Sequence, residues 1–121
     1  MKKAIIFDLD GTLWDTSNET KKIWSEVAKQ YNLKNSNYKI SDIMGMTREE
    51  IIEYLFKNDR ELGRNFITEC QKKENKYFAT NGGHIYNNVP KVIYDLYNQF
   101  ELYIVSNCQS GYIESFLQYY S

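Results

Sequence analysis

Two acidic side chains of this chain stand where both could act on one reacting centre. Residues 4–7 are apolar, and Asp8 and Asp10 follow them almost directly. Because Asp8 and Asp10 are two positions apart, their side chains point to the same side while the chain remains extended. Gly11 then permits a tight turn, and Thr12 supplies a hydroxyl group and an amide that can face an anion. This combination suits a site that holds a metal ion and a phosphate group together.

The elements that must position these residues are indicated by the spacing of the apolar side chains. Residues 3–9 contain a short continuous apolar run, which is typical of a central parallel strand covered on both faces. Residues 101–105 are rich in β-branched and aromatic side chains and predict a second strand. Residues 16–80 show only helical spacing, with capping-box patterns that begin at Thr16 and Thr47.

The order of the elements indicates an α/β fold. Two further helices are predicted, one that begins near Pro90 and one that begins near Ser110. We predict a partial Rossmann-like parallel sheet as the core, with an inserted α-helical cap. Residues 1–15 and 81–121 form the predicted core, and residues 16–80 form the predicted cap. Ligands of such sheets bind at the carboxyl ends of the strands, which is where the two aspartates stand.

The last predicted helix suggests an incomplete core. Its apolar face, which includes Ile113, Phe116 and Tyr120, continues to the end of the sequence with no later element to pack against. Two strands also make a small sheet, since parallel α/β sheets are normally larger. We therefore expect the C-terminal part of the core to be missing, and we expect self-association through the incomplete core.

Two short segments carry a resemblance to a known family. The segment Asp8 to Thr12 (DLDGT), after its strand, resembles the first motif of the haloacid dehalogenase superfamily, and Val105 to Asn107 (VSN) resembles the second. The helical block between them resembles the cap of phosphoglycolate-phosphatase-like and β-phosphoglucomutase-like members. After Ser106 the chain has no lysine, and its one later acid, Glu114, lies inside a predicted helix. The family's third motif, a lysine, and its fourth, an acidic pair, are therefore missing from the sequence.

The resemblance implies a Mg²⁺-dependent phosphatase that acts on a small phosphorylated metabolite through an aspartyl-phosphate intermediate. Asp8 would be the nucleophile, and Asp10 the general acid and base. The Asp8 carboxylate and the backbone carbonyl of Asp10 would bind the metal. Thr12, Ser106 and the amide of Asn107 would hold the phosphoryl oxygens.

Arg48 is a further candidate for substrate binding. It follows the glycine-containing segment 44–47, which resembles the cap loop that faces the substrate in helical-cap members. A cation in the first turn of a helix opposes the helix dipole unless an anion is near. A surface ion pair with a nearby glutamate explains Arg48 equally well.

The first motif also allows other interpretations. Asp8, Asp10, Thr12 and Glu19 occupy positions of an EF-hand-like calcium loop, but Leu13 stands where that loop needs glycine. The acids could also be solvated turn residues. A sugar phosphomutase would keep the same chemistry, whereas a non-catalytic remnant would only bind phosphate or a partner chain.

Composition excludes several classes of partner. The 15 basic and 16 acidic residues nearly cancel, so we predict no nucleic-acid partner. No apolar stretch approaches membrane-spanning length, so we predict no membrane partner and a cytoplasmic location. Cys70 and Cys108 are predicted to be free thiols, because neither stands in a metal-binding pattern and the one histidine, His84, has no cysteine close to it.

Overall fold

Two parallel strands form the main sheet in the part of the chain that the structure describes. The computed structural model describes residues 3–31, 33, 40–43 and 45–120. Strands β1 (Lys3–Phe7) and β4 (Phe100–Ile104) pair in parallel along their whole length. The predicted first strand ends two residues early, at Phe7, because the backbone of Leu9 already belongs to a turn. The predicted α/β class with a parallel sheet is confirmed.

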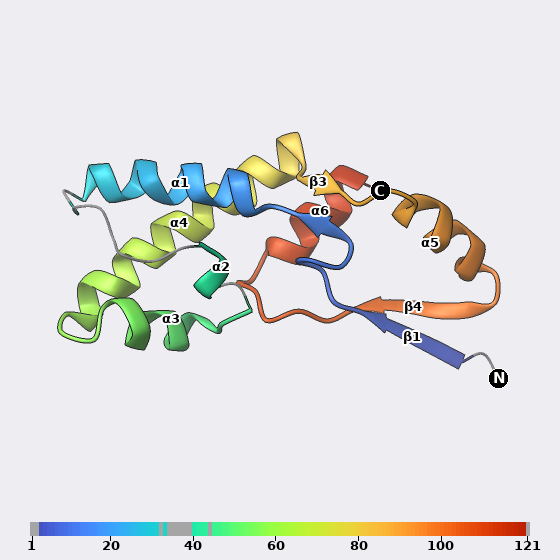
Figure 1. The fold of residues 1–121 in the computed structure, drawn as a ribbon, viewed down its shortest axis with the longest axis horizontal. Coiled ribbons are helices and arrows are strands. Elements are labelled where there is room, and N and C mark those ends of the chain that lie inside the picture. Colours follow the sequence, from blue (N-terminus) through green and yellow to red (C-terminus); the bar gives the residue numbers. More distant parts are fainter. Residues whose placement is uncertain (1–2, 32, 34–39, 44, 121) are drawn as a thin grey trace.

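Among the described residues, four helices form the half of the molecule away from the sheet (Figure 1). They are α1 (Ser17–Gln30), α2 (Ile40–Ile43), α3 (Arg48–Leu55) and α4 (Arg60–Asn81). Their apolar faces meet in one buried cluster, here called the helical cluster: Ile23, Trp24, Val27, Ile43, Ile51, Ile52, Phe66, Ile67 and Cys70. The described part of residues 16–80 is therefore helical as predicted, and the apolar faces of its helices point inward.

The two predicted capping boxes have different outcomes. Thr47 accepts a hydrogen bond from the backbone N–H of Glu50, whose side chain accepts one from the N–H of Thr47. This capping box is confirmed. Thr16 also stands at a helix N-terminus, but its side chain makes no capping bond, so the box predicted there is wrong.

A second buried cluster lies beneath the turn that follows β1. This aromatic cluster consists of Leu9, Leu13, Trp14, Phe78, Tyr112 and Phe116. The Trp14 ring is at its centre, with ring centroids 4.9 Å from Phe116 and 5.3 Å from Phe78. Phe78 belongs to α4, and Phe116 belongs to α6 (Tyr112–Tyr120). The expectation that this last helix has nothing to pack against is therefore wrong for its buried residues, which pack against the end of α4 and the Trp14 ring.

A short antiparallel pair of strands was not predicted. Strand β2 (Trp14–Asp15) pairs with β3 (His84–Ile85), and each has only two residues. Segments of two residues are too short to show the alternation by which strands are recognised in a sequence. Helix α5 (Val89–Tyr97) follows, and its Pro90 lies in the first turn as predicted.

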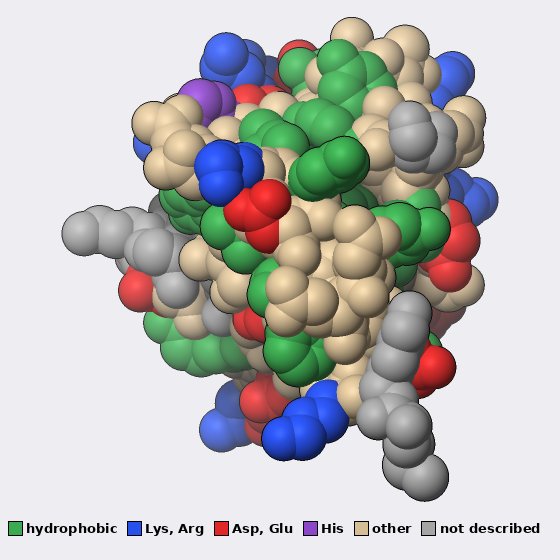
Figure 2. All heavy atoms as spheres, turned by 90° about the vertical axis from the view of Figure 1, so that its right-hand side faces the viewer, with side chains coloured by type: hydrophobic (Ala, Val, Ile, Leu, Met, Phe, Trp, Pro, Cys, Tyr) green, Lys and Arg blue, Asp and Glu red, His purple; other side chains and the backbone are tan. Residues whose placement is uncertain are grey.

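One face of the sheet is exposed. Ile6 is 66% exposed, Tyr103 51% and Val105 63%. The prediction that β1 is covered on both faces is therefore wrong for the residues described. An apolar groove of about 740 Å³ also lies between the sheet, α5 and α6. Figure 2, which views this end of the molecule, shows hydrophobic side chains gathered at its surface.

None of the described helices combines the length and the apolar content that a bilayer crossing requires.

Candidate active site

The chain turns sharply after β1 and its two aspartates. The carbonyl of Leu9 accepts hydrogen bonds from the amides of Thr12, at 3.2 Å, and Leu13, at 2.9 Å. Gly11 has a φ of 78°, and its amide donates to the carbonyl of Trp14 at 2.9 Å. A side chain at that φ would be strained, which explains the glycine. These bonds hold the turn at the carboxyl end of β1.

Asp10 is the more buried of the two aspartates. Its Oδ1 accepts hydrogen bonds from the Tyr112 hydroxyl at 2.7 Å and from Trp14 Nε1 at 2.9 Å. The Thr16 hydroxyl donates to the same oxygen at 3.5 Å. Burial raises the pKa of Asp10, and the nearby Asp8 adds to this effect, although the three donors lower it. Asp10 therefore takes up a proton more readily than a fully exposed aspartate, which is the direction that a general acid requires.

Asp8 has a different environment. Its side chain is exposed, and its Oδ1 accepts a hydrogen bond from the backbone N–H of Leu9 at 2.8 Å. Thr12, at the outer side of the same turn, is also exposed. Asp8 is therefore accessible to an incoming group in a way that Asp10 is not.

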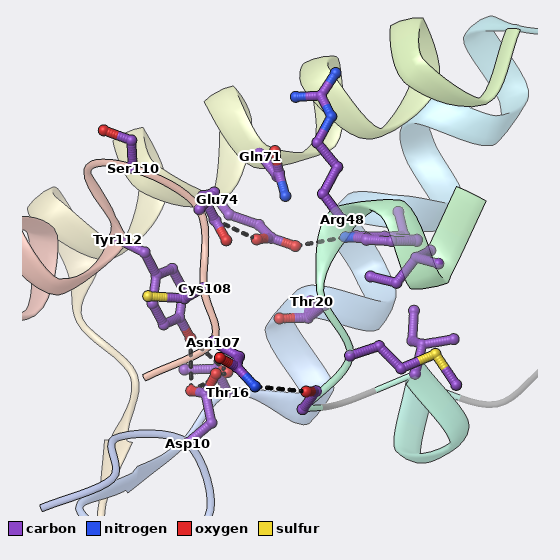
Figure 3. Close-up of a pocket in the computed structure, with 16 residues that line it drawn as sticks. Asp10, Thr16, Thr20, Arg48, Gln71, Glu74, Asn107, Cys108, Ser110 and Tyr112 are labelled. Carbon is purple, nitrogen blue, oxygen red and sulfur yellow. Dashed lines mark hydrogen bonds between the residues drawn. The ribbon is translucent and has the colours of Figure 1, made fainter. Parts of the chain in front are cut away.

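A pocket of about 210 Å³ opens beside Asp10. Figure 3 shows that its walls come from the turn after β1, from α1 and α4, and from the loops before α3 and after β4. Its polar lining consists of Asp10, Thr16, Thr20, Arg48, Gln71, Glu74, Asn107, Gln109, Ser110 and Tyr112. The pocket thus lies between the helical half of the molecule and the sheet.

The structure brings only some of the predicted site residues to this pocket. Asp10 and Asn107 line it, and Asn107 Nδ2 donates to the carbonyl of Gly45 at 3.5 Å. Asp8, Thr12 and Ser106 lie outside its lining. The roles assigned to these residues stay predictions.

Arg48 lines the pocket, but its guanidinium is held elsewhere. Arg48 Nη2 donates to the Thr68 hydroxyl at 2.6 Å and to the carbonyl of Arg64 at 3.2 Å. In Figure 3 the guanidinium points away from Asp10, toward α4. These partners, rather than a glutamate, explain how the cation is tolerated in the first turn of α3. Substrate contact by Arg48 stays a prediction, and Met44 of the preceding loop lies outside the described residues.

Sequence reasoning missed Glu74. This carboxyl group, 5% exposed, accepts hydrogen bonds from Trp24 Nε1 and from Gln109 Nε2, the latter at 2.8 Å. Burial raises its pKa to about 7, against the lowering effect of its two donors. The signal was present in the sequence, because Glu74 continues the buried helical spacing of Phe66, Cys70 and Phe78 on α4.

Sequence reasoning also missed the bonds around Thr16 and Tyr112. The two hydroxyl groups lie 3.0 Å apart, and both contact Asp10. Burial raises the pKa of Tyr112, with the charge of Asp10 adding to the effect. Tyr112 therefore remains a neutral donor to Asp10. No sequence signal joins positions 96 residues apart, so only the fold could reveal this arrangement.

The described residues do not form a complete metal site by themselves. They contain no group of three or more His, Cys, Asp or Glu side chains placed to hold an ion. Asp8 and Asp10 supply oxygen ligands of the kind that Mg²⁺ prefers. Cys70 is buried, Cys108 is partly buried, and both are free thiols.

Comparison with known proteins decides the family. Residues 5–121 match the haloacid dehalogenase-like hydrolases. This chain belongs to that family. The match covers nearly the whole sequence, so the resemblance carried by the two motifs is confirmed.

Relatives of this haloacid dehalogenase-like chain are longer than it is. Pyrophosphatase PpaX of Oceanobacillus iheyensis is 30% identical over 93 residues, which make up 74% of this chain and 42% of that protein. A Lactobacillus plantarum structure, provisionally described as a phosphoglycolate phosphatase, superposes with a TM-score of 0.77 at 20% identity and covers 96% of this chain and 55% of that one. A haloacid dehalogenase-like hydrolase from Bacteroides fragilis, also provisionally described, gives a TM-score of 0.72 at 21% identity and covers 97% of this chain and 57% of that one. The chain thus spans about half the length of the structures whose fold it shares.

Proposed function

We propose that this chain carries the nucleophile and the general acid of a Mg²⁺-dependent phosphatase that acts on a small phosphorylated metabolite in the cytoplasm. The observation that carries the proposal is the turn after β1, where an exposed Asp8 and a half-buried Asp10 stand at the carboxyl end of a parallel strand. Family membership supports it, because the names of its relatives include phosphatases.

The proposed reaction divides between the two aspartates. A carboxylate oxygen of Asp8 forms a bond to phosphorus while the bond from phosphorus to the leaving oxygen breaks. Asp10 gives its proton to that oxygen, then takes one from the water that hydrolyses the aspartyl phosphate. The raised pKa of Asp10 supports the first of these roles.

The remaining roles follow the same motifs. Thr12, Ser106 and the backbone amide of Asn107 would bind the phosphoryl oxygens where negative charge develops. Mg²⁺, held by the Asp8 carboxylate and the backbone carbonyl of Asp10, would offset the repulsion between two carboxylates and a phosphate dianion. The exposure of Asp8 fits this use, because its second oxygen can reach a ligand.

The test is Mg²⁺-dependent release of p-nitrophenol from p-nitrophenyl phosphate. The samples are the 121-residue chain, its Asp8→Asn variant, and a chain extended to the length of the relatives. Activity that Asp8→Asn abolishes in either chain supports the proposal. An extended chain without Mg²⁺-dependent activity would contradict it, and conversion of a sugar 1-phosphate to its isomer would indicate the phosphomutase instead.

We further propose that the chain self-associates through its exposed sheet face. The exposure of Ile6, Tyr103 and Val105 supports this, because apolar side chains gathered at one surface favour contact with a second apolar surface. Light scattering should show a mass that rises above the monomer with concentration. A monomer mass throughout, or an increase unaffected by Tyr103→Lys, would contradict it.

A further inference from the structure

Glu74 is a buried carboxyl group that faces the same pocket as Asp10. It projects from the middle of α4 and is 5% exposed. Among the described residues it forms no ion pair, and its two partners, Trp24 Nε1 and Gln109 Nε2, are neutral donors. A carboxylate buried without a cation is unfavourable, so its retention at a pocket wall calls for an explanation.

Neutral donors leave Glu74 with unused hydrogen-bonding capacity. A carboxyl group has about four acceptor positions when ionised, and one donor when protonated. The contacts with Trp24 and Gln109 use one position on each oxygen. The side chain can therefore bind a further polar group that enters the pocket.

The charge of the pocket favours one kind of entering group. Its described lining contains two carboxyl groups, Asp10 and Glu74, and a single cationic residue, Arg48. The guanidinium of Arg48 is bound to α4, through Thr68 and the carbonyl of Arg64. A carboxylate or phosphate on the leaving group would offer only acceptors to the oxygens of Asp10 and Glu74, and it would find no available cation among these residues.

We propose that Glu74 binds the leaving group of the substrate, and that this group is neutral or cationic and carries hydrogen-bond donors such as hydroxyl or ammonium groups. The inference rests on the proposed phosphatase function, because it assigns the pocket beside Asp10 to the leaving group. The substrate proposed for this chain therefore differs from the substrates that appear in the names of its relatives. Phosphoglycolate and pyrophosphate both leave an anion.

The experiment compares four phosphate monoesters that share a phosphoryl group and differ in the rest of the molecule. They are phosphoethanolamine, glycerol 3-phosphate, ethyl phosphate and phosphoglycolate. Dissociation constants are measured calorimetrically with Mg²⁺ present, for the wild-type chain, for Glu74→Gln and for Glu69→Gln. Glu69 lies on the same helix, outside the pocket lining, and serves as the matched control.

The expected result is a ranking that depends on Glu74. Phosphoethanolamine and glycerol 3-phosphate should bind wild type about tenfold more tightly than phosphoglycolate, which corresponds to a difference of about 1.4 kcal/mol in binding free energy. Glu74→Gln should bring that ratio close to one, whereas Glu69→Gln should preserve it. Thermal melting of each variant shows whether it is folded.

Three results in the ranking of the esters would overturn the inference. They are equal binding of all four esters by wild type, tighter binding of phosphoglycolate, and a ranking that survives in folded Glu74→Gln. Absence of binding by every ester would overturn it too. Loss of p-nitrophenyl phosphate hydrolysis in the extended chain would instead count against the proposed function, so the two failures are separable.

Discussion

Replacing Glu74 with glutamine should make the stability of the fold less dependent on pH. Burial raises the pKa of this group to about 7 from an ordinary value of 4.5. Between these pH values Glu74 keeps its proton in the folded chain and has released it in the unfolded chain. The free energy of unfolding should therefore fall as pH rises through this range, and the loss is complete only above the folded-state value. Glutamine does not titrate, so the variant lacks this contribution.

The size of the effect follows from the same two values. Integrated from about pH 5 to about pH 8, the protonation difference destabilises wild type by roughly 2.5 kcal/mol. Urea unfolding of both proteins at these two pH values measures it. The stability of Glu74→Gln relative to wild type should increase by that amount on going to the higher pH. Glu69→Gln, on the same helix, is measured in parallel as the control for loss of a glutamate from α4.

One result would refute the reasoning. If the stability difference between Glu74→Gln and wild type were the same at both pH values, Glu74 would titrate alike in the folded and unfolded chains. Asp10 faces the same pocket and also has a raised pKa, but it is present in both proteins. Its titration therefore largely cancels in the comparison.

Three further substitutions test other contacts of the site. Tyr112→Phe removes a donor to Asp10 that lowers the aspartate's pKa, so that pKa should rise, as a carboxyl NMR titration would show; an unchanged value would contradict this. Gly11→Ala should lower the free energy of unfolding, measured with urea, by about 1–2 kcal/mol, because the φ of 78° is strained for alanine and the added methyl group makes no new contact. Phe116→Ala should lower the free energy of unfolding by about 3–5 kcal/mol, because it removes a ring from the aromatic cluster and leaves a cavity. Leu117→Ala, at an exposed position, should lower it far less.

The helices and the main strands could be predicted because their signals are local. The apolar spacing of α1 and α4 specifies which faces turn inward, and the capping box at Thr47 specifies where α3 begins. The turn after β1 was predictable for the same reason, since Gly11 and the acids around it are contiguous. Such features depend on neighbours within a few residues, which a single sequence displays.

The pocket could not be predicted in the same way, because its contacts join distant parts of the chain. Thr16 illustrates the difference. Its local pattern indicates a helix cap, yet the fold brings Tyr112 within 3.0 Å of its hydroxyl and directs both groups to Asp10. A tertiary contact has replaced the local one. Arg48 shows the same competition, since the hydroxyl of Thr68 binds a guanidinium for which the sequence suggested either a substrate or a nearby glutamate as the partner.

Glu74 shows how a broken local rule can indicate a site. On the apolar face of α4, between Cys70 and Phe78, a leucine or methionine would pack without any cost of burying charge. The chain instead has a carboxyl group there, and the fold supplies it with two neutral donors but no described cation. Sequences that specify a fold tend to break such rules at functional positions. A polar residue on the buried face of a helix therefore becomes informative once the fold shows that this part of the face borders a pocket rather than the centre of a core.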